Sequence, residues 1–168
     1  GGELKEVDVA VKDKKILQIG QISEEAKETI DASGHTVLPG CIDTQTHFRE
    51  PGSTDTEDLH SGSRAAIAGG ITSVFEMPNT NPPTSNKKEF QRKLDLAKNR
   101  MYCNYAFYFG ATAENADDLA SLKDLEGCCG IKLFAGSSTG NLLVAEEDDI
   151  DKVFQNASKV VALSLIHI

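Results

Sequence analysis

The sequence predicts an α/β fold, in which the strands of a parallel sheet alternate with helices that cross from one strand to the next. After residue 35, apolar runs typical of buried strands alternate four times with segments of helical periodicity. Both a doubly wound sheet and a (β/α)8 barrel fit this alternation. No glycine-rich dinucleotide fingerprint follows any strand, which weighs against the nucleotide-binding doubly wound fold. Unusual polar residues stand where the predicted strands end, the edge at which barrels carry their chemistry.

Two short strands are expected before this alternation begins. Residues 7–11 alternate between apolar and polar side chains, and residues 14–20 follow after a polar turn. Acidic and polar residues then lead to another apolar strand over 35–43. Pro39 lies inside that run, and proline cannot donate to a central ladder. We therefore expect the chain to cross there from one structural unit into the next.

Helices and strands then alternate along the rest of the chain. Ser85 or Asn86 is suited to cap one helix, because apolar residues recur behind it at helical spacing. Asn115 is expected to cap another. The expected helices cover 56–69, 85–100, 115–125 and 146–158, and the expected strands cover 71–77, 104–110, 130–136 and 159–166.

The amino-acid composition argues against several classes of protein for this chain. The 168 residues carry a formal net charge of −9, which argues against a nucleic-acid-binding surface. No apolar run is long enough to cross a membrane. None of the four cysteines has the CxxC spacing of a zinc knuckle, so we expect reduced thiols in a cytoplasmic protein. They are Cys41, Cys103, Cys128 and Cys129.

One candidate site lies in the segment DTQTHFREPG, residues 43–52. In an extended strand every second side chain points to the same face, so four polar residues would lie together. They are Asp43, Gln45, His47 and Arg49. An isolated histidine at a strand end is most often hydrogen-bonded to a neighbour. Here Asp43 could orient the imidazole as a metal ligand, and Arg49 has the rigid fork that suits a carboxylate.

Lys132 is a second candidate, because it interrupts the apolar strand GIKLFAG. A lysine is costly to bury unless it has a partner or a function. The structural explanations are a buried pair with a carboxylate, or an edge position from which the amine reaches water. The functional explanations are a Schiff base, a base of depressed pKa, or a carbamate formed with CO2, whose oxygens can bridge two divalent metals. The strand pattern alone leaves all of these open.

Two loops are candidates for ligand contact. Asn79 lies in MPNTNPPT, residues 77–84, where asparagine before a proline-rich turn usually serves the turn itself. Its amide could equally face a bound carboxylate or ring. The hydroxyl-rich loop GSSTGN, residues 136–141, follows the strand that contains Lys132. Most loops of this composition are connectors, and its position also allows a lid that touches substrate.

Three segments taken together resemble dihydroorotases of the cyclic amidohydrolase superfamily. They are PGCIDTQTHFREPG, AGGITSVFEMPNTNPPT and GIKLFAGSSTGN, in this order, and the resemblance extends to about Ala162. HFREPG and MPNTNPP are the most specific motifs. Hydantoinases and allantoinases, the nearest relatives, share the lysine and the barrel but match the Arg49–Asn79 pair less well.

The resemblance implies an architecture and a reaction. Residues 37–162 would form the first half of a metal-dependent-hydrolase (β/α)8 TIM barrel, about strands 1–5, and residues 1–36 part of a composite β-sandwich. The enzyme would hydrolyse cyclic amide C–N bonds, reversibly cyclising N-carbamoyl-L-aspartate to L-dihydroorotate in pyrimidine biosynthesis. Its implied partners are a small-molecule substrate and, when full length, a second copy in a homodimer, with no nucleic acid and no membrane.

The resemblance also implies the roles of the site residues. One or two zinc ions would activate a bridging hydroxide and polarise the scissile carbonyl. His47 would ligate zinc, and Lys132, as a carbamate derived from CO2, would bridge the metals. Arg49 and Asn79 would hold the substrate carboxylate. The general-base aspartate and two further histidines would lie beyond residue 168.

Gln45 departs from the family pattern, which is usually His-x-His at this strand. A glutamine carbonyl is a poor zinc ligand beside an imidazole. The metal position that Gln45 would serve is therefore expected to be weak or empty, which allows a single-zinc enzyme. The same departure leaves open a catalytically silent, dihydroorotase-like scaffold subunit, against which Lys132 argues.

The final segment LSLIHI, residues 163–168, does not continue the family pattern. It resembles an in-frame translation of a common sequencing-library adapter, and we expect a non-native tail there. The alternative is a natural ending in which His167 is the next zinc ligand. An N-terminal fragment of this kind is expected to be inactive and poorly soluble by itself, because half a barrel leaves open sheet edges.

Overall fold

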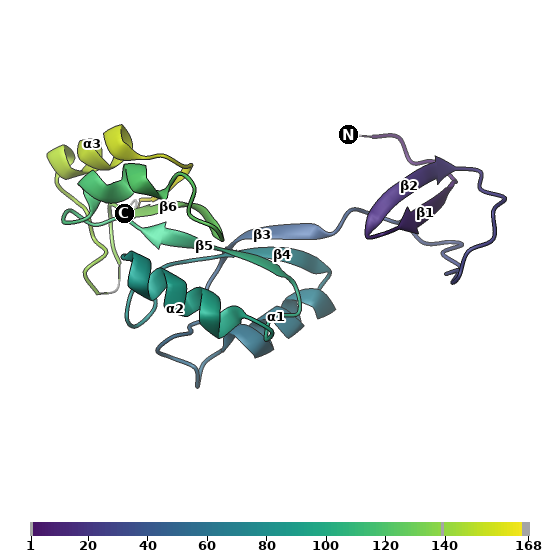
Figure 1. Ribbon diagram of the computed structural model, residues 1–168, viewed down its shortest axis with the longest axis horizontal. Helices are drawn as coiled ribbons and strands as arrows, with labels where there is room; N and C mark the ends of the chain where they lie inside the picture. Colours follow the sequence, from purple (N-terminus) through teal and green to yellow (C-terminus); the bar gives the residue numbers. More distant parts are fainter. Residues whose placement is uncertain (1, 139, 166–168) are drawn as a thin grey trace. The chain divides into compact units, whose positions relative to one another are not determined.

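The computed structural model describes residues 2–138 and 140–165 (Figure 1). The chain divides into two compact units, residues 1–38 and residues 39–168, and the division falls directly before Pro39. All the candidate site residues belong to the second unit.

The first unit contains one β-hairpin. β1 (Asp8–Lys12) pairs antiparallel with β2 (Lys15–Gly20). The turn between them has a left-handed backbone at Asp13 and Lys14, with φ angles of 51° and 63°. Apolar side chains of both strands are exposed, and a two-stranded hairpin is marginally stable without further packing. The composite β-sandwich expected for residues 1–36 stays a prediction.

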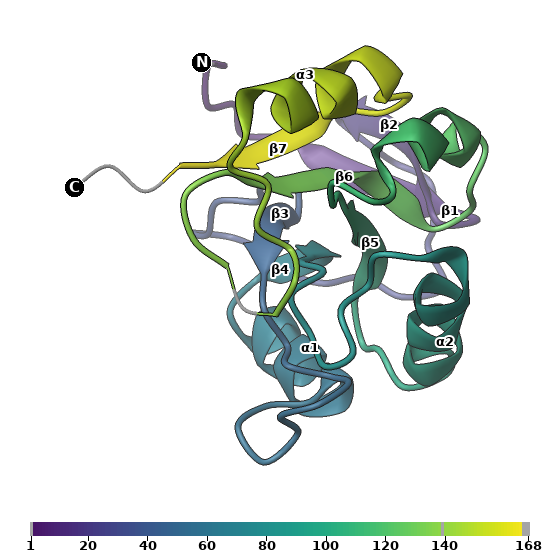
Figure 2. The ribbon, with the colours of Figure 1, turned by 90° about the vertical axis from the view of Figure 1, so that its left-hand side faces the viewer.

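The second unit is built on a five-stranded parallel sheet whose strands follow one another in sequence order. A doubly wound sheet reverses its strand order at a switch point, whereas this order runs in one direction. Figure 2 shows the sheet curling, with the helices along its outer side. The structure therefore selects the barrel, of which this chain forms about half. The strands are β3 (Cys41–Thr46), β4 (Ile71–Glu76), β5 (Asn104–Gly110), β6 (Cys128–Phe134) and β7 (Val161–Ser164).

Helical segments connect the strands and cover one face of the sheet. They are α1 (Leu59–Ala68), α2 (Lys87–Ala97), the 3-10 helix η1 (Ala116–Leu122) and α3 (Glu147–Asn156). Leu59, Phe90 and Val153 of the three α-helices are fully buried. They belong to one apolar cluster with strand residues such as Phe107 and Ile131. The core therefore lies between the helices and the sheet, and it holds the strand ends in place.

Helix α2 begins close to where the sequence predicts. Asn86 rather than Ser85 is the N-cap, and its side chain accepts a hydrogen bond from the amide of Glu89 at 2.9 Å. Asn115 stands at the expected N-cap position, but the helix that follows is a short 3-10 helix and the Asn115 side chain makes no capping hydrogen bond to it. Asn115 Nδ2 donates to the carbonyls of Ser85 and Gly110, at 2.8 and 2.9 Å. Asn115 thereby joins the loops that follow β4 and β5.

Strand β3 differs from the prediction, since it covers residues 41–46 rather than 35–43. Its register against β4 shifts between Asp43 and Thr46, where Asp43 faces Val74 and Thr46 faces Glu76. This bulge and the end of the strand interrupt the regular alternation of side chains. The expectation of one shared strand face is therefore wrong for Asp43, Gln45, His47 and Arg49.

Strand β7 includes the first residues of the segment expected to be a non-native tail. Leu163 and Ser164 pair in register with β6. Residues 166–168 lie outside the described residues, so the tail and His167 as a zinc ligand both stay predictions.

Two expectations from composition can be compared with the structure. All four cysteines are free thiols, as expected. Burial raises the pKa of the Cys103 and Cys128 thiols, which makes them less reactive. Across residues 2–138 and 140–165, no helix is both long and apolar enough to cross a membrane.

Candidate active site at the ends of the parallel strands

The candidate side chains come from three strands of the same sheet, β3, β4 and β6. His47 and Arg49 follow β3, Asn79 follows β4, and Lys132 lies near the end of β6. Arg49 and Asn79 line the same cavity, of about 430 Å³. Gly140, from the loop after β6, lines it as well. The other lining residues are Pro51, Ser53, Thr80, Asn81 and Pro83.

His47 and Asn79 form a direct hydrogen bond, with Nδ1 of the imidazole 2.9 Å from Oδ1 of the amide. An amide oxygen can only accept, so Nδ1 carries the proton. In the neutral ring the lone pair is then on Nε2, the nitrogen that remains available as a ligand. Asn79 therefore takes the orienting role that was expected of Asp43, whose Oδ1 instead accepts from the backbone amide of Gln45 at 2.9 Å.

The surroundings of His47 favour the neutral imidazole. Burial is the largest effect that lowers the pKa of His47, and the positive charges of Arg49 and Lys132 lower it further. The hydrogen bond with Asn79 raises this pKa but does not reverse the shift. A neutral imidazole is the form that binds metal ions.

Backbone hydrogen bonds hold the two loops against each other. The amide of Met77 donates to the carbonyl of Thr46 at 2.9 Å, joining the ends of β4 and β3. Farther out, the amide of Asn81 donates to the carbonyl of Pro51 at 2.9 Å. Thr46 directly precedes the histidine, and Met77 stands two residues before the asparagine. The contact between imidazole and amide therefore rests on a fixed backbone.

Lys132 is buried in the middle of the sheet. β6 lies between β5 and β7, and only 3% of Lys132 is exposed, so the edge explanation does not apply. Among the described residues, no carboxylate lies within ion-pair distance of its amine. Its Nζ lies 5.1 Å from the centroid of the Phe134 ring. Desolvation lowers the pKa of Lys132, which increases the fraction of neutral, nucleophilic amine.

Arg49 is presented by an anchored loop. It is exposed, and its φ of 60° is a left-handed angle that costs a non-glycine residue about 1 kcal/mol or more. The next residue holds the loop: Glu50 accepts from both terminal nitrogens of Arg100, at 2.7 and 3.1 Å. Glu50 Oε2 also accepts from the amide of Leu59, the first residue of α1, at 2.9 Å. The exposed guanidinium is thus carried by a rigid backbone.

Few metal ligands come from this chain. Within the described residues, no group of three or more His, Cys, Asp or Glu side chains is placed to hold a metal ion. His47 offers Nε2, and the buried Lys132 amine would become an anionic oxygen donor as a carbamate. Imidazole nitrogen and anionic oxygen are both suitable zinc ligands, so these two residues fit the metal. Gln45 is exposed, and no described hydrogen bond holds its side chain as a third ligand.

The sequence patterns do not predict a buried ion pair that lies beside these loops. Glu76, the last residue of β4, pairs with Lys93 of α2, and both side chains are at most 1% exposed. A signal was present in the sequence. Lys93 lies three residues after Phe90 and four before Ala97, on the apolar stripe of its helix, and Glu76 alternates with the buried Val74.

Comparisons of the sequence and of the structure with known proteins lead to the same group of enzymes. Residues 36–164 match the amidohydrolase family. The chain is 36% identical over 166 residues to a dihydroorotase of Methanosarcina mazei, covering 98% of this chain and 36% of that protein. It is 37% identical over 171 residues to an allantoinase of Escherichia coli O1:K1 / APEC, covering 98% and 38%. An L-hydantoinase structure from Arthrobacter aurescens superposes with a TM-score of 0.85 at 30% identity, covering 95% and 37%. The chain thus spans just over a third of the length of the curated relatives it matches.

Proposed function

Because this chain belongs to the amidohydrolase family, we propose that the complete protein is a dihydroorotase. It would reversibly close N-carbamoyl-L-aspartate to L-dihydroorotate, a reaction of pyrimidine biosynthesis. The relatives include a dihydroorotase, an allantoinase and a hydantoinase, which supports a cyclic amide as the substrate class. The choice among rings depends on particular side chains.

The observation that carries the proposal is the cavity that Arg49 and Asn79 share. Dihydroorotate bears a carboxylate, whereas hydantoin and allantoin rings do not. A guanidinium offers two parallel N–H donors that match a carboxylate. The oxygen of Asn79 accepts from His47, whereas no described hydrogen bond uses the two N–H donors of its amide, which remain available for a ligand. Donors of this kind support a substrate with a carboxylate.

We assign His47 and Lys132 to the zinc site. Nε2 of His47 would be one ligand. The neutral amine of Lys132 would add to CO2 and release a proton, so that the new N–C bond leaves an anionic carbamate as the second ligand. Zinc, when bound, supplies a Lewis acid for the scissile carbonyl. The weak donor at Gln45 favours one zinc ion over two.

Replacing the guanidinium tests the substrate assignment. In the complete protein, we expect Arg49→Met to raise the KM for dihydroorotate by about 10- to 100-fold, because hydrogen bonds to a charged group contribute about 1.5–3 kcal/mol. Steady-state kinetics with dihydroorotate, hydantoin and allantoin measure this. Arg64→Met is the matched control, since Arg64 is exposed on α1. An unchanged KM for dihydroorotate would show that Arg49 does not bind the carboxylate.

Two alternatives give different results in these experiments. An allantoinase or hydantoinase would turn over a neutral ring and be insensitive to Arg49→Met. A catalytically silent scaffold subunit, which Gln45 leaves open, would contain no zinc and would turn over none of the three rings. Metal analysis of the purified complete protein separates the scaffold from both enzymes.

A further inference from the structure

Lys93 is a fully buried lysine outside the site described above. It lies on α2, with 0% of the residue exposed, and its amine forms an ion pair with Glu76. The same amine donates a hydrogen bond to the backbone carbonyl of Met77 at 2.9 Å. It also lies 5.2 Å from the centroid of the Phe107 ring. A lysine is rarely buried to this extent, because desolvating its charge is costly.

Met77 connects the loop that follows β3 with the loop that follows β4. Its N–H donates to Thr46, the residue before His47, and its C=O accepts from Lys93. Both backbone groups of Met77 therefore have a partner: its N–H is bonded to the end of β3, and its C=O is bonded to a side chain of α2. Asn79 follows two residues later and meets the imidazole at 2.9 Å.

We propose that Lys93 is a positioning residue, which holds the Met77 carbonyl so that Asn79 meets His47 and lines the cavity with Arg49. In this role Glu76 is the counter-charge that allows the amine to stay buried. The proposal rests on the proposed function only in naming the substrate that the cavity binds. Lys93 itself does not line the cavity.

A purely stabilising role makes a different prediction. Replacing both members of a buried ion pair by apolar residues of similar volume is often neutral or stabilising, whereas removing one member leaves an unpaired charge. If the pair served stability alone, replacing both residues by apolar ones would preserve both the melting temperature and kcat/KM. If Lys93 positions the loop, the apolar replacement restores stability but not the hydrogen bond to Met77.

The double variant Glu76→Leu/Lys93→Met in the complete protein separates these roles. We expect its melting temperature to stay near that of the wild type while kcat/KM falls by about 10- to 100-fold, because small displacements of binding groups have effects of this size. We expect Glu76→Gln nearly to preserve kcat/KM, since the lysine still donates to Met77. A double variant with wild-type kcat/KM overturns the proposal, and so does a Glu76→Gln variant that loses as much kcat/KM as the double variant.

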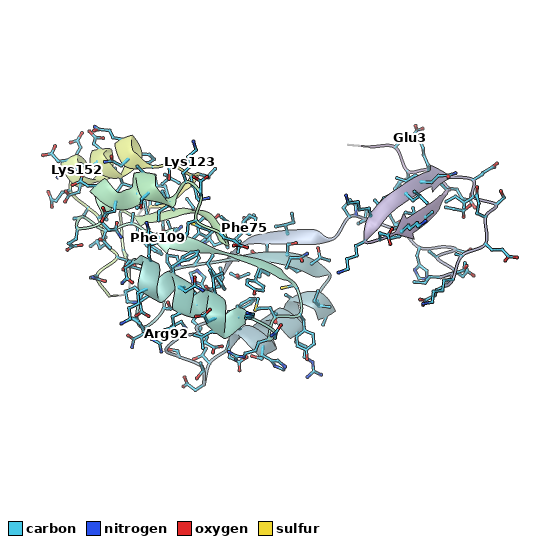
Figure 3. The ribbon with its side chains drawn as sticks, in the orientation of Figure 1. Glu3, Phe75, Arg92, Phe109, Lys123 and Lys152 are labelled. Carbon is cyan, nitrogen blue, oxygen red and sulfur yellow. The ribbon has the colours of Figure 1, made fainter. Side chains whose placement is uncertain are left out.

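Arg92→Met is the matched control on the same helix. Arg92, labelled in Figure 3, is one residue from Lys93, has a 53% exposed side chain and pairs only with Glu89 among the described residues. It should leave both melting temperature and kcat/KM unchanged.

Hydrogen exchange of the wild-type complete protein provides a test that needs no variant and no substrate. The amides of Thr80 and Thr84, which donate to the Pro78 carbonyl, should exchange as slowly as those of α2. Fast exchange of this loop beside a protected helix would overturn the proposal. If dihydroorotate were not the substrate, kcat/KM would be measured on the ring that is turned over. The proposed function would then fail while the positioning role was still decided.

Discussion

The His47 imidazole and the Asn79 amide, 32 positions apart in the sequence, meet through a hydrogen bond of 2.9 Å between Nδ1 and Oδ1. The bond keeps the ring proton on Nδ1 and leaves the Nε2 lone pair available. It also turns the amide oxygen toward His47 and leaves the two N–H donors of Asn79 without a described partner, so that they can serve a ligand. One side chain therefore acts on both the proposed metal ligand and the proposed substrate clamp.

Substitution of Asn79 should weaken metal binding as well as substrate binding. In the complete protein, we expect Asn79→Ala to lower the affinity for zinc by about 10- to 100-fold, as is typical when the partner of a metal-bound histidine is removed. Zinc titration against a competing chelator measures this without any turnover. Asn79→Asp, which keeps an oxygen acceptor for Nδ1, should retain most of the zinc affinity. Equal zinc affinity for the wild type and Asn79→Ala would contradict the orienting role.

Removing the Lys132 amine should separate stability from function. We expect Lys132→Met to raise the melting temperature of the zinc-free complete protein, because a buried amine without a described counter-charge is replaced by an apolar side chain. Activity and zinc content should be lost in the same variant. Lys123→Met, at an exposed lysine labelled in Figure 3, is the control and should change neither. A destabilised zinc-free Lys132→Met protein would argue for a structural lysine instead.

The buried Glu76 predicts an unusual dependence of stability on pH. Desolvation raises the pKa of Glu76 from 4.5 to about 7, so the folded state binds this proton more tightly than the unfolded state. The contribution of Glu76 to stability is fully present below about pH 4.5 and is lost as the pH rises through about 7. Chemical denaturation between pH 5 and about pH 7 should show this loss relative to Glu76→Leu/Lys93→Met, which lacks both groups. If the free energy of unfolding changed with pH in the same way for the wild type and the double variant, this prediction would be refuted.

The contact of Phe48 with α1 predicts a sharp difference between two glycines of the same region. A Cβ at Gly62 would lie 2.4 Å from Cδ1 of Phe48, whereas a Cβ at Gly69 would find no atom closer than 3.5 Å. We expect Gly62→Ala to destabilise the protein by about 1–3 kcal/mol, since the ring next to His47 must move. Gly69→Ala should be close to neutral. Denaturant melts of both variants test this, and similar stabilities would show that the ring yields easily.

Much of the fold follows from local patterns. Strand β5 covers residues 104–110, as its apolar pattern predicts, and α2 begins behind Asn86 because the side chain of that residue caps it. The less accurate predictions concern places where tertiary contacts override local preference. The side chain of Asn115 makes no capping hydrogen bond to the helix that follows it, and its amide donates to the carbonyls of Ser85 and Gly110 instead.

The sequence was sufficient to single out the candidate site residues, but not to predict which of their side chains contact one another. Lys132 could be singled out because a lysine within an apolar strand conflicts with the cost of burying charge. The partner of His47 could not, because a bulge in β3 changes which side chains face one another. Local alternation favours Asp43, and the structure provides Asn79 instead.

The amino-acid sequence by itself determined the alternation of strands and helices and placed polar residues at the strand ends. Only the tertiary structure decided that the sheet curls in one direction, that His47 bonds to Asn79, and that Lys93 lies buried against Met77. The physical reason is the distance along the chain over which each kind of interaction acts. Periodicity and capping act over a few neighbouring residues, whereas these pairings depend on strand register and helix packing, which bring distant segments together.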